Sequence, residues 1–154
     1  MEKNELQLNR VAEIKLSYHP LVRPVDRPKV SDSREVYQLL LANWDLDLIE
    51  LQEQFKIILL NRANQVIGIS EISKGGMNGT VVDTRLIFGI ALKACASAIV
   101  LAHNHPSGNL KPSAADLMTT KRIVECGKFL ELDVFDHLIV TPDGYLSMMD
   151  DGLI

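Results

Sequence analysis

The sequence has few cysteines and none of the common glycine-rich nucleotide motifs. Its two cysteines, Cys95 and Cys126, form no CxxC pair, which argues against a zinc ribbon and against a disulfide framework. We expect both to be buried thiols in a reducing compartment. Neither GxxxxGK[ST] nor GxGxxG occurs, so we expect the glycine-bearing segment 75–79 to be a flexible loop and not a phosphate-binding loop.

The sequence also lacks an excess of basic residues and a long apolar run. Its 16 Lys and Arg residues against 20 Asp and Glu residues give a net charge of −4 at pH 7. This balance disfavours a broadly basic surface, so we do not expect a nucleic-acid partner. No run is long enough to cross a bilayer, and the charged segment 1–10 has no signal-peptide core. We therefore expect a cytoplasmic protein without a membrane partner.

What is present fits a folded domain with a short arm. Of the 154 residues, 47% are apolar and 23% are charged, as in ordinary globular proteins. Alternating apolar residues predict a half-buried strand over 11–18, and the three prolines between residues 20 and 28 predict a linker. We therefore divide the chain into an N-terminal strand and proline-rich arm, residues 1–30, and one domain, residues 31–154.

Helices and strands are both predicted within residues 31–154. The expected helices run from a cap at Ser31 or Ser33 to about Trp44, from a cap at Asp83 or Thr84 to about Ala94, and over 113–130. The expected strands cover 53–61, 65–73, 97–102, 134–140 and 145–149, with turns at 62–64 and 142–144. This order indicates an α/β domain with a mixed central sheet flanked by helices.

Two histidines at the end of an apolar strand carry the strongest chemical signal. Successive side chains of a strand alternate between faces, so His103 and His105 can face one ion while Asn104 faces away. Asp116, in the first turn of the next predicted helix, can fold back to supply an oxygen ligand. Two imidazoles and a carboxylate leave one tetrahedral position for water and suit Zn²⁺ better than Mg²⁺ or Ca²⁺.

The same residues resemble a known family. The HxHP and SxxD elements within 103–116 resemble the JAMM (JAB/MPN+) metalloprotease motif. The longer string AHNHPSGNLKPSAAD, with Asp136-His137 after it, is more similar to the bacterial RadC-type branch. The resemblance covers the chain from about Asp32 onwards. It implies that residues 31–154 form one RadC-type JAB/MPN domain with a cytidine-deaminase-like α/β fold.

The resemblance implies roles for four side chains of this segment. His103, His105 and Asp116 would bind Zn²⁺, and Ser113 would help to stabilise the oxyanion that develops on an attacked carbonyl. A structural alternative exists for Ser113-x-x-Asp116, because this pattern is also close to a helix capping box. We expect a metal-bound Asp116 to have little capacity left for the cap.

The resemblance also implies an upstream glutamate that accepts a proton from the metal-activated water and passes it to the leaving amine. Glu53 fits best, because the sequence after it resembles the RadC-type strand pair. Spacing alone leaves Glu50 and Glu71 open. The implied activity is hydrolysis of an amide bond, either peptide or isopeptide, in a peptide or protein substrate.

Other features qualify this hypothesis. Asn104 stands where the eukaryotic deubiquitinating branch usually has Ser or Thr, so ubiquitin is not assumed as the substrate. His137 is interpreted either as a partner of a metal-bound imidazole or as a paired core histidine, and Asp136 likewise. The helix-hairpin-helix module common in RadC-type proteins is not recognisable in residues 1–30.

Two alternative functions remain at this stage. One is a binding or scaffold protein with the same fold and little or no catalysis, and the other is the DNA-repair association that the family name suggests. The intact ligand set argues against the scaffold, because a scaffold has no physical need for an open zinc position. The sequence does not determine the oligomeric state, the substrate, or the role of residues 1–30.

Overall fold

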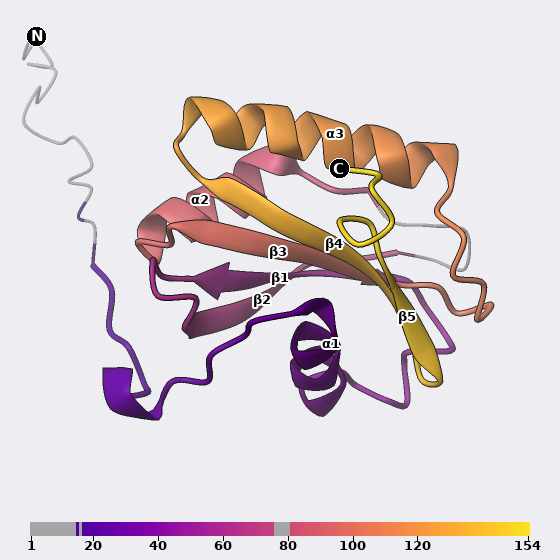
Figure 1. The fold of residues 1–154 in the computed structure, drawn as a ribbon, viewed down its shortest axis with the longest axis horizontal. Coiled ribbons are helices and arrows are strands. Elements are labelled where there is room, and N and C mark those ends of the chain that lie inside the picture. The colour runs from indigo at the N-terminus through magenta and orange to yellow at the C-terminus, as the bar shows by residue number, and fades with distance from the viewer. Residues whose placement is uncertain (1–14, 16, 76–80) are drawn as a thin grey trace, which may run out of the picture.

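The protein is described here by a computed structural model, which covers residues 15, 17–75 and 81–154. A five-stranded sheet lies between helices on both faces (Figure 1). Its strands are β1 (Gln54–Leu60), β2 (Val66–Lys74), β3 (Ala98–Asn104), β4 (Asp133–Thr141) and β5 (Gly144–Ser147). Helix α1 (Ser33–Ala42) covers one face, whereas α2 (Thr84–Lys93) and α3 (Ala114–Phe129) cover the other.

The strand order is β2-β1-β3-β4-β5. Strand β1 pairs antiparallel with β2 and with β3, β3 pairs parallel with β4, and β4 pairs antiparallel with β5. The prediction of an α/β domain with a mixed sheet is therefore confirmed. The two central strands β1 and β3 are buried along their whole length, which explains their continuous apolar sequences.

Alternation along the strands divides the core into two layers. Even-numbered residues such as Ile58 and Val100 pack with Leu40 of α1. Odd-numbered residues such as Ile57 and Leu101 pack against α2 and α3. At the ends of the strands the same alternation continues, so odd-numbered side chains lie on the face of the sheet that α3 covers.

The helix starts follow from side-chain caps. Asp32 accepts a hydrogen bond from the Glu35 N–H, so the predicted cap at Ser31 or Ser33 is wrong by one residue. Asp83 caps α2, one of the two predicted choices. Ser113 caps α3 with a complete capping box. This cap fixes where the first turn of α3 meets the sheet.

Several predictions are corrected or fall outside the described residues. The strand predicted over 97–102 continues to Asn104, so His103 lies within β3. Cys95 is exposed and has a positive φ of 54°, so the prediction that it is buried is wrong; Cys126 is half-buried. The strand predicted over 11–18 and the loop over 75–79 lie largely outside the described residues.

Among the described residues, no helix combines the length and the apolar character that crossing a membrane requires.

Candidate metal centre

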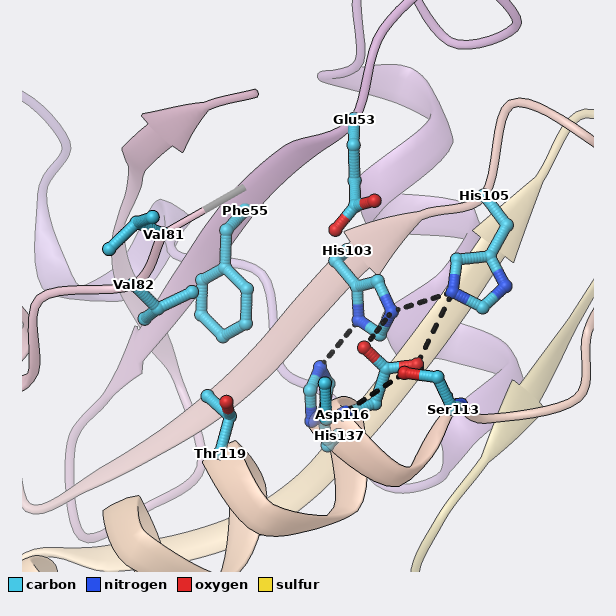
Figure 2. A pocket seen from close by; sticks show the side chains of 11 residues that line it. Glu53, Phe55, Val81, Val82, His103, His105, Ser113, Asp116, Thr119 and His137 are labelled. Atoms are coloured by element: carbon cyan, nitrogen blue, oxygen red, sulfur yellow. Dashed lines mark hydrogen bonds and ion pairs between the residues drawn. The ribbon is translucent and has the colours of Figure 1, made fainter. Parts of the chain in front are cut away.

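A cavity of about 500 Å³ opens where the end of β3 meets the start of α3. Its polar wall is formed by histidines, carboxylates, a serine and a threonine, and its apolar wall includes Phe55, Val81 and Val82. Figure 2 shows that the histidine and carboxylate side chains point towards one another. The polar residues are Glu53, His103, His105, Ser113, Asp116, Thr119 and His137.

Three of these side chains form a group that could hold a metal ion. One ligand atom from each of His103, His105 and Asp116 can be chosen so that all lie within 4.8 Å of one another. The two histidine Nε2 atoms are 3.0 Å apart. The Asp116 carboxylate oxygens lie 3.4 Å from His103 Nε2 and 3.5 Å from His105 Nε2. The i, i+2 spacing of the histidines thus places both imidazoles on one face, as predicted.

A chain of hydrogen bonds assigns the proton on His103. The Thr120 hydroxyl donates to the Asp116 carbonyl, which can only accept, at 2.7 Å. Thr120 Oγ1 therefore accepts from His137 Nδ1 at 2.6 Å, which leaves His137 Nε2 as an acceptor. His137 Nε2 accepts from His103 Nδ1 at 2.8 Å. The lone pair of His103 is consequently on Nε2, the nitrogen that faces His105 and Asp116.

His105 is oriented in the same way from the other side. Its Nδ1 donates to the Asn109 carbonyl, which can only accept, so in the neutral ring its lone pair is also on Nε2. The turn that presents this carbonyl contains Gly108 at a φ of 78°, a conformation that favours glycine. When both rings are neutral, two nitrogen lone pairs and a carboxylate therefore converge, and this arrangement favours a cation between them.

The pKa values of His105 and Asp116 reflect the contact between the imidazole and the carboxylate. The hydrogen bond to Asp116 raises the pKa of His105, although partial burial opposes this shift. Burial raises the pKa of Asp116, but hydrogen bonds from His103 and His105, which these rings donate when a proton is on Nε2, outweigh burial and leave that pKa well below its usual range. A metal ion bound at this group would therefore have to compete with a proton.

The donor set fits zinc. Ligand atoms about 2.0–2.1 Å from a tetrahedral Zn²⁺ lie roughly 3.3 Å from one another, which is close to the separations among these three side chains. Two neutral imidazoles and one carboxylate are also typical zinc ligands, whereas Mg²⁺ and Ca²⁺ take mostly oxygen.

Asp116 serves the helix cap and the site together. Its Oδ2 accepts from the Ser113 N–H at 2.7 Å, while Ser113 Oγ accepts from the Asp116 N–H at 3.1 Å. Its Oδ1 still faces His103. The capping box is thus formed while one carboxylate oxygen faces the histidines, because two carboxylate oxygens offer about four lone-pair positions. That a metal-bound Asp116 has little capacity left for the cap stays a prediction.

The three candidate glutamates lie in different places. The β1–β3 register pairs Phe55 with His103, so continuing it by two residues brings Glu53 opposite His105. Glu53 lines the cavity, and its carboxylate points into it (Figure 2). Glu50 lines a separate cavity, and Glu71 accepts a hydrogen bond from Gln54 Nε2 at 2.7 Å. Of the three glutamates, Glu53 is thus the one that lies beside the candidate metal ligands, and its catalytic role stays a prediction.

Ser113 and His137 are also placed at the cavity, whereas Asp136 is not. The Ser113 hydroxyl accepts from the Asp116 N–H, and no acceptor engages its proton among the described residues. His137 is fully buried, and burial followed by the nearby His103 lowers its pKa well below the ordinary value. Asp136 instead accepts from Ser147 Oγ at 2.6 Å and joins β4 to β5.

Two residues of the site carried no sequence signal. Thr120 continues the hydrogen-bond chain behind His103, and Asn109 orients His105 through its carbonyl. A helical threonine and a turn asparagine are common in any domain, so neither could be singled out. Phe55 adds an apolar wall and stacks on His103, with ring centroids 6.2 Å apart.

Comparisons with known proteins agree with the sequence and the fold. Residues 30–153 match the family model described as a RadC-like JAB domain. A UPF0758 protein of Flavobacterium johnsoniae is 46% identical over 101 residues, which are 66% of this chain and 44% of that protein. UPF0758 protein STH371 of Symbiobacterium thermophilum is 36% identical over 144 residues, which are 94% of this chain and 60% of that protein.

A further relative, a UPF0758 protein of Porphyromonas gingivalis, is 40% identical over 129 residues, 83% of this chain and 56% of that protein. The chain thus spans about half the length of the curated relatives it matches. The family match covers the strands and helices that build the cavity, including both histidines and Asp116. The chain belongs to the RadC-like JAB-domain family.

Proposed function

We propose that the chain is a zinc-dependent hydrolase that cleaves an amide bond in a peptide or protein. The observation that carries the proposal is the convergence of two histidine Nε2 atoms, 3.0 Å apart, on a carboxylate in an open cavity. His103, His105 and Asp116 would hold the ion. When bound, zinc would acidify a water molecule and stabilise negative charge on the attacked carbonyl oxygen.

Glu53 would move the proton in this reaction. As water adds to the carbonyl carbon, its carboxylate would accept one water proton and then pass it to the nitrogen, so that the C–N bond breaks and a neutral amine leaves. No hydrogen bond or ion pair engages this carboxylate within residues 15, 17–75 and 81–154, which leaves it available for that exchange.

Ser113 would stabilise the carbonyl oxygen as it becomes negative. Its oxygen is already positioned by the Asp116 N–H at 3.1 Å, so the hydroxyl proton can be donated towards the cavity. A donor aimed at developing charge lowers the barrier more than it improves substrate binding. The apolar wall at Phe55 and Val82 would exclude water from one side of the substrate.

The test uses a diverse synthetic peptide library in ¹⁸O-labelled water, read by mass spectrometry. The zinc-loaded chain should incorporate one ¹⁸O into each new carboxyl terminus, and a chelator should abolish the reaction. Glu53→Gln should slow cleavage by about 10²–10⁴-fold, as expected for a lost general base. Glu50→Gln is the matched control and should keep wild-type activity, because Glu50 lines a different cavity.

Two outcomes would contradict the proposal. Zinc-loaded protein that cleaves no peptide would favour the binding or scaffold alternative. Cleavage that survives both the chelator and Glu53→Gln would show that a different site, or a contaminant, is responsible.

A further inference from the structure

Asn104 stands between the two histidines, but its side chain faces the opposite side of the sheet. It is completely buried. Its Nδ2 group donates to the carbonyl oxygens of Ile49, at 2.6 Å, and Gln52, at 2.9 Å. Its Oδ1 accepts from the Gln54 N–H at 2.6 Å. Both amide protons and the carbonyl of one side chain are thus used on a single short segment, residues 49–54.

The bond to Gln54 takes over where strand pairing ends. The β1–β3 register ends at the pair Phe55 and His103. Beyond it, the Gln54 N–H bonds to the Asn104 side chain, and the carbonyl of the same peptide group, Glu53 O, accepts from the Gly75 N–H at 2.7 Å. The peptide group between Glu53 and Gln54 is therefore held from both sides, which restricts the backbone at Glu53.

The position of the Glu53 carboxylate depends on that backbone. In the described part of the chain no side chain or backbone group holds the carboxylate itself, so its reach into the cavity is set by where its Cα lies. A proton acceptor must come within about 2.6–3.2 Å of its proton. Displacement of a reacting group by about 1 Å can cost roughly 100-fold in rate.

We propose that Asn104 is a positioning residue that ties the histidine-bearing strand β3 to the segment that carries Glu53. It thereby sets the distance between the metal ligands on one face of β3 and the proton acceptor. The inference rests on the proposed function, because it assigns Asn104 an effect on catalysis through Glu53. It predicts no effect on the ligands, since the three hydrogen bonds of the Asn104 amide go to residues 49–54.

The first experiment measures amide hydrogen exchange in the metal-free protein. In Asn104→Ala the Gln54 amide should lose about 10–100-fold of its protection, as expected for one lost buried hydrogen bond. Asn61→Ala is the matched control, because the Asn61 side chain also makes three hydrogen bonds, at the other end of β1. The Gln65 N–H donates to Asn61 Oδ1, so in this control the Gln65 amide should exchange faster. The Gln54 amide should keep its protection from exchange.

A second variant covers the case in which Asn104→Ala does not fold. Asn104→Asp has the same shape and keeps the oxygen that accepts from the Gln54 N–H. It loses both donors and places a charge against the carbonyl oxygens of Ile49 and Gln52. It should therefore keep Gln54 protected and release the 49–52 segment, including the Gln52 amide, which bonds to Leu48 O at 3.0 Å.

The second experiment separates positioning from metal binding. Zinc affinity, measured by competition with a chromophoric chelator, should stay within about threefold of wild type in Asn104→Ala, or roughly 0.7 kcal/mol. In Asn104→Ala the addition of zinc should change the ¹³C chemical shift of the Glu53 carboxyl carbon less than it does in wild type. The kcat for the peptides cleaved by wild type should fall about 100-fold in Asn104→Ala, and adding Asn104→Ala to Glu53→Gln should cause no further loss.

The outcomes are distinguishable. Unchanged Gln54 protection in Asn104→Ala, or losses in kcat that multiply with those of Glu53→Gln, would overturn the positioning role. A matching loss of kcat in Asn61→Ala would also overturn it, because the effect would then be general destabilisation. If wild type binds no zinc or cleaves no peptide, the proposed function fails, and the catalytic part of this inference fails with it.

Discussion

Replacement of His137 by Phe tests the hydrogen-bond chain that orients His103. Phe fills a similar volume but cannot accept the His103 Nδ1–H, which now ends on His137 Nε2 at 2.8 Å. In the metal-free variant His103 can avoid an orphaned donor by moving its proton to Nε2. Zinc binding would then have to force the proton back to Nδ1, where no acceptor remains.

The expected loss follows from that proton transfer. A buried donor without an acceptor costs about 1–3 kcal/mol. Loss of the partner of a metal-bound histidine typically lowers metal affinity by about 10–100-fold, which is about 1.4–2.8 kcal/mol. The two estimates agree, so His137→Phe should bind zinc about 10–100-fold more weakly.

The assay is zinc competition against a chromophoric chelator, with two companion variants. His137→Gln can place Oε1 near the former Nε2 position, so it should recover most of the affinity. Thr141→Val is the control on the same strand, since the Thr141 hydroxyl bonds to Gly144 in the β4–β5 turn. Wild-type zinc affinity in a folded His137→Phe, or a Gln variant no better than Phe, would refute the reasoning.

Three further predictions concern stability and protons. Gly127→Ala should destabilise the fold by about 1–3 kcal/mol, because its Cβ would lie 2.4 Å from the Leu132 carbonyl oxygen. Gly89→Ala in α2 places its Cβ within 4 Å of no other atom, so it should stabilise the fold by about 0.5–1 kcal/mol. Urea unfolding of both variants measures these changes, and equal effects would contradict the prediction. Burial lowers the pKa of His137, so below about pH 6.5 the unfolded chain binds a proton that the folded chain does not. As the pH falls below that value, the free energy of unfolding of metal-free wild type should decrease by up to about 1.4 kcal/mol per pH unit relative to His137→Gln. A stability difference between the two proteins that is independent of pH would contradict this prediction. The raised pKa of His105 means that zinc displaces a proton, so calorimetry in buffers of different ionisation enthalpy should show more proton release at about pH 6 than at about pH 8, and no pH dependence would argue against His105 as a ligand.

The local parts of the site could be predicted from the sequence. The i, i+2 spacing of His103 and His105 places both on one face of a strand, and the same alternation turns Asn104 away. The Ser113-x-x-Asp116 pattern predicts a helix start, and α3 begins there with a capping box. These features depend on neighbours in the chain, so propensity and spacing are sufficient.

The remaining parts depend on contacts between distant segments. The choice of Glu53 over Glu50 and Glu71 requires the β1–β3 register, which no local pattern encodes. The chain from His103 to His137 joins residues 34 positions apart. The sequence predicts a buried Cys95, but the chain turns there with a positive φ and exposes this residue. Contacts and turns of this kind can be assigned only when the three-dimensional arrangement of the strands is known.

X-ray absorption at the zinc edge tests the central claim most directly. Protein dialysed against zinc and then against buffer should retain one ion per chain, with two imidazole nitrogens at about 2.0–2.1 Å and the remaining ligands oxygen. His103→Ala and His105→Ala should each remove one imidazole from this shell. A shell of oxygen atoms alone, or no zinc retained after dialysis, would contradict the account.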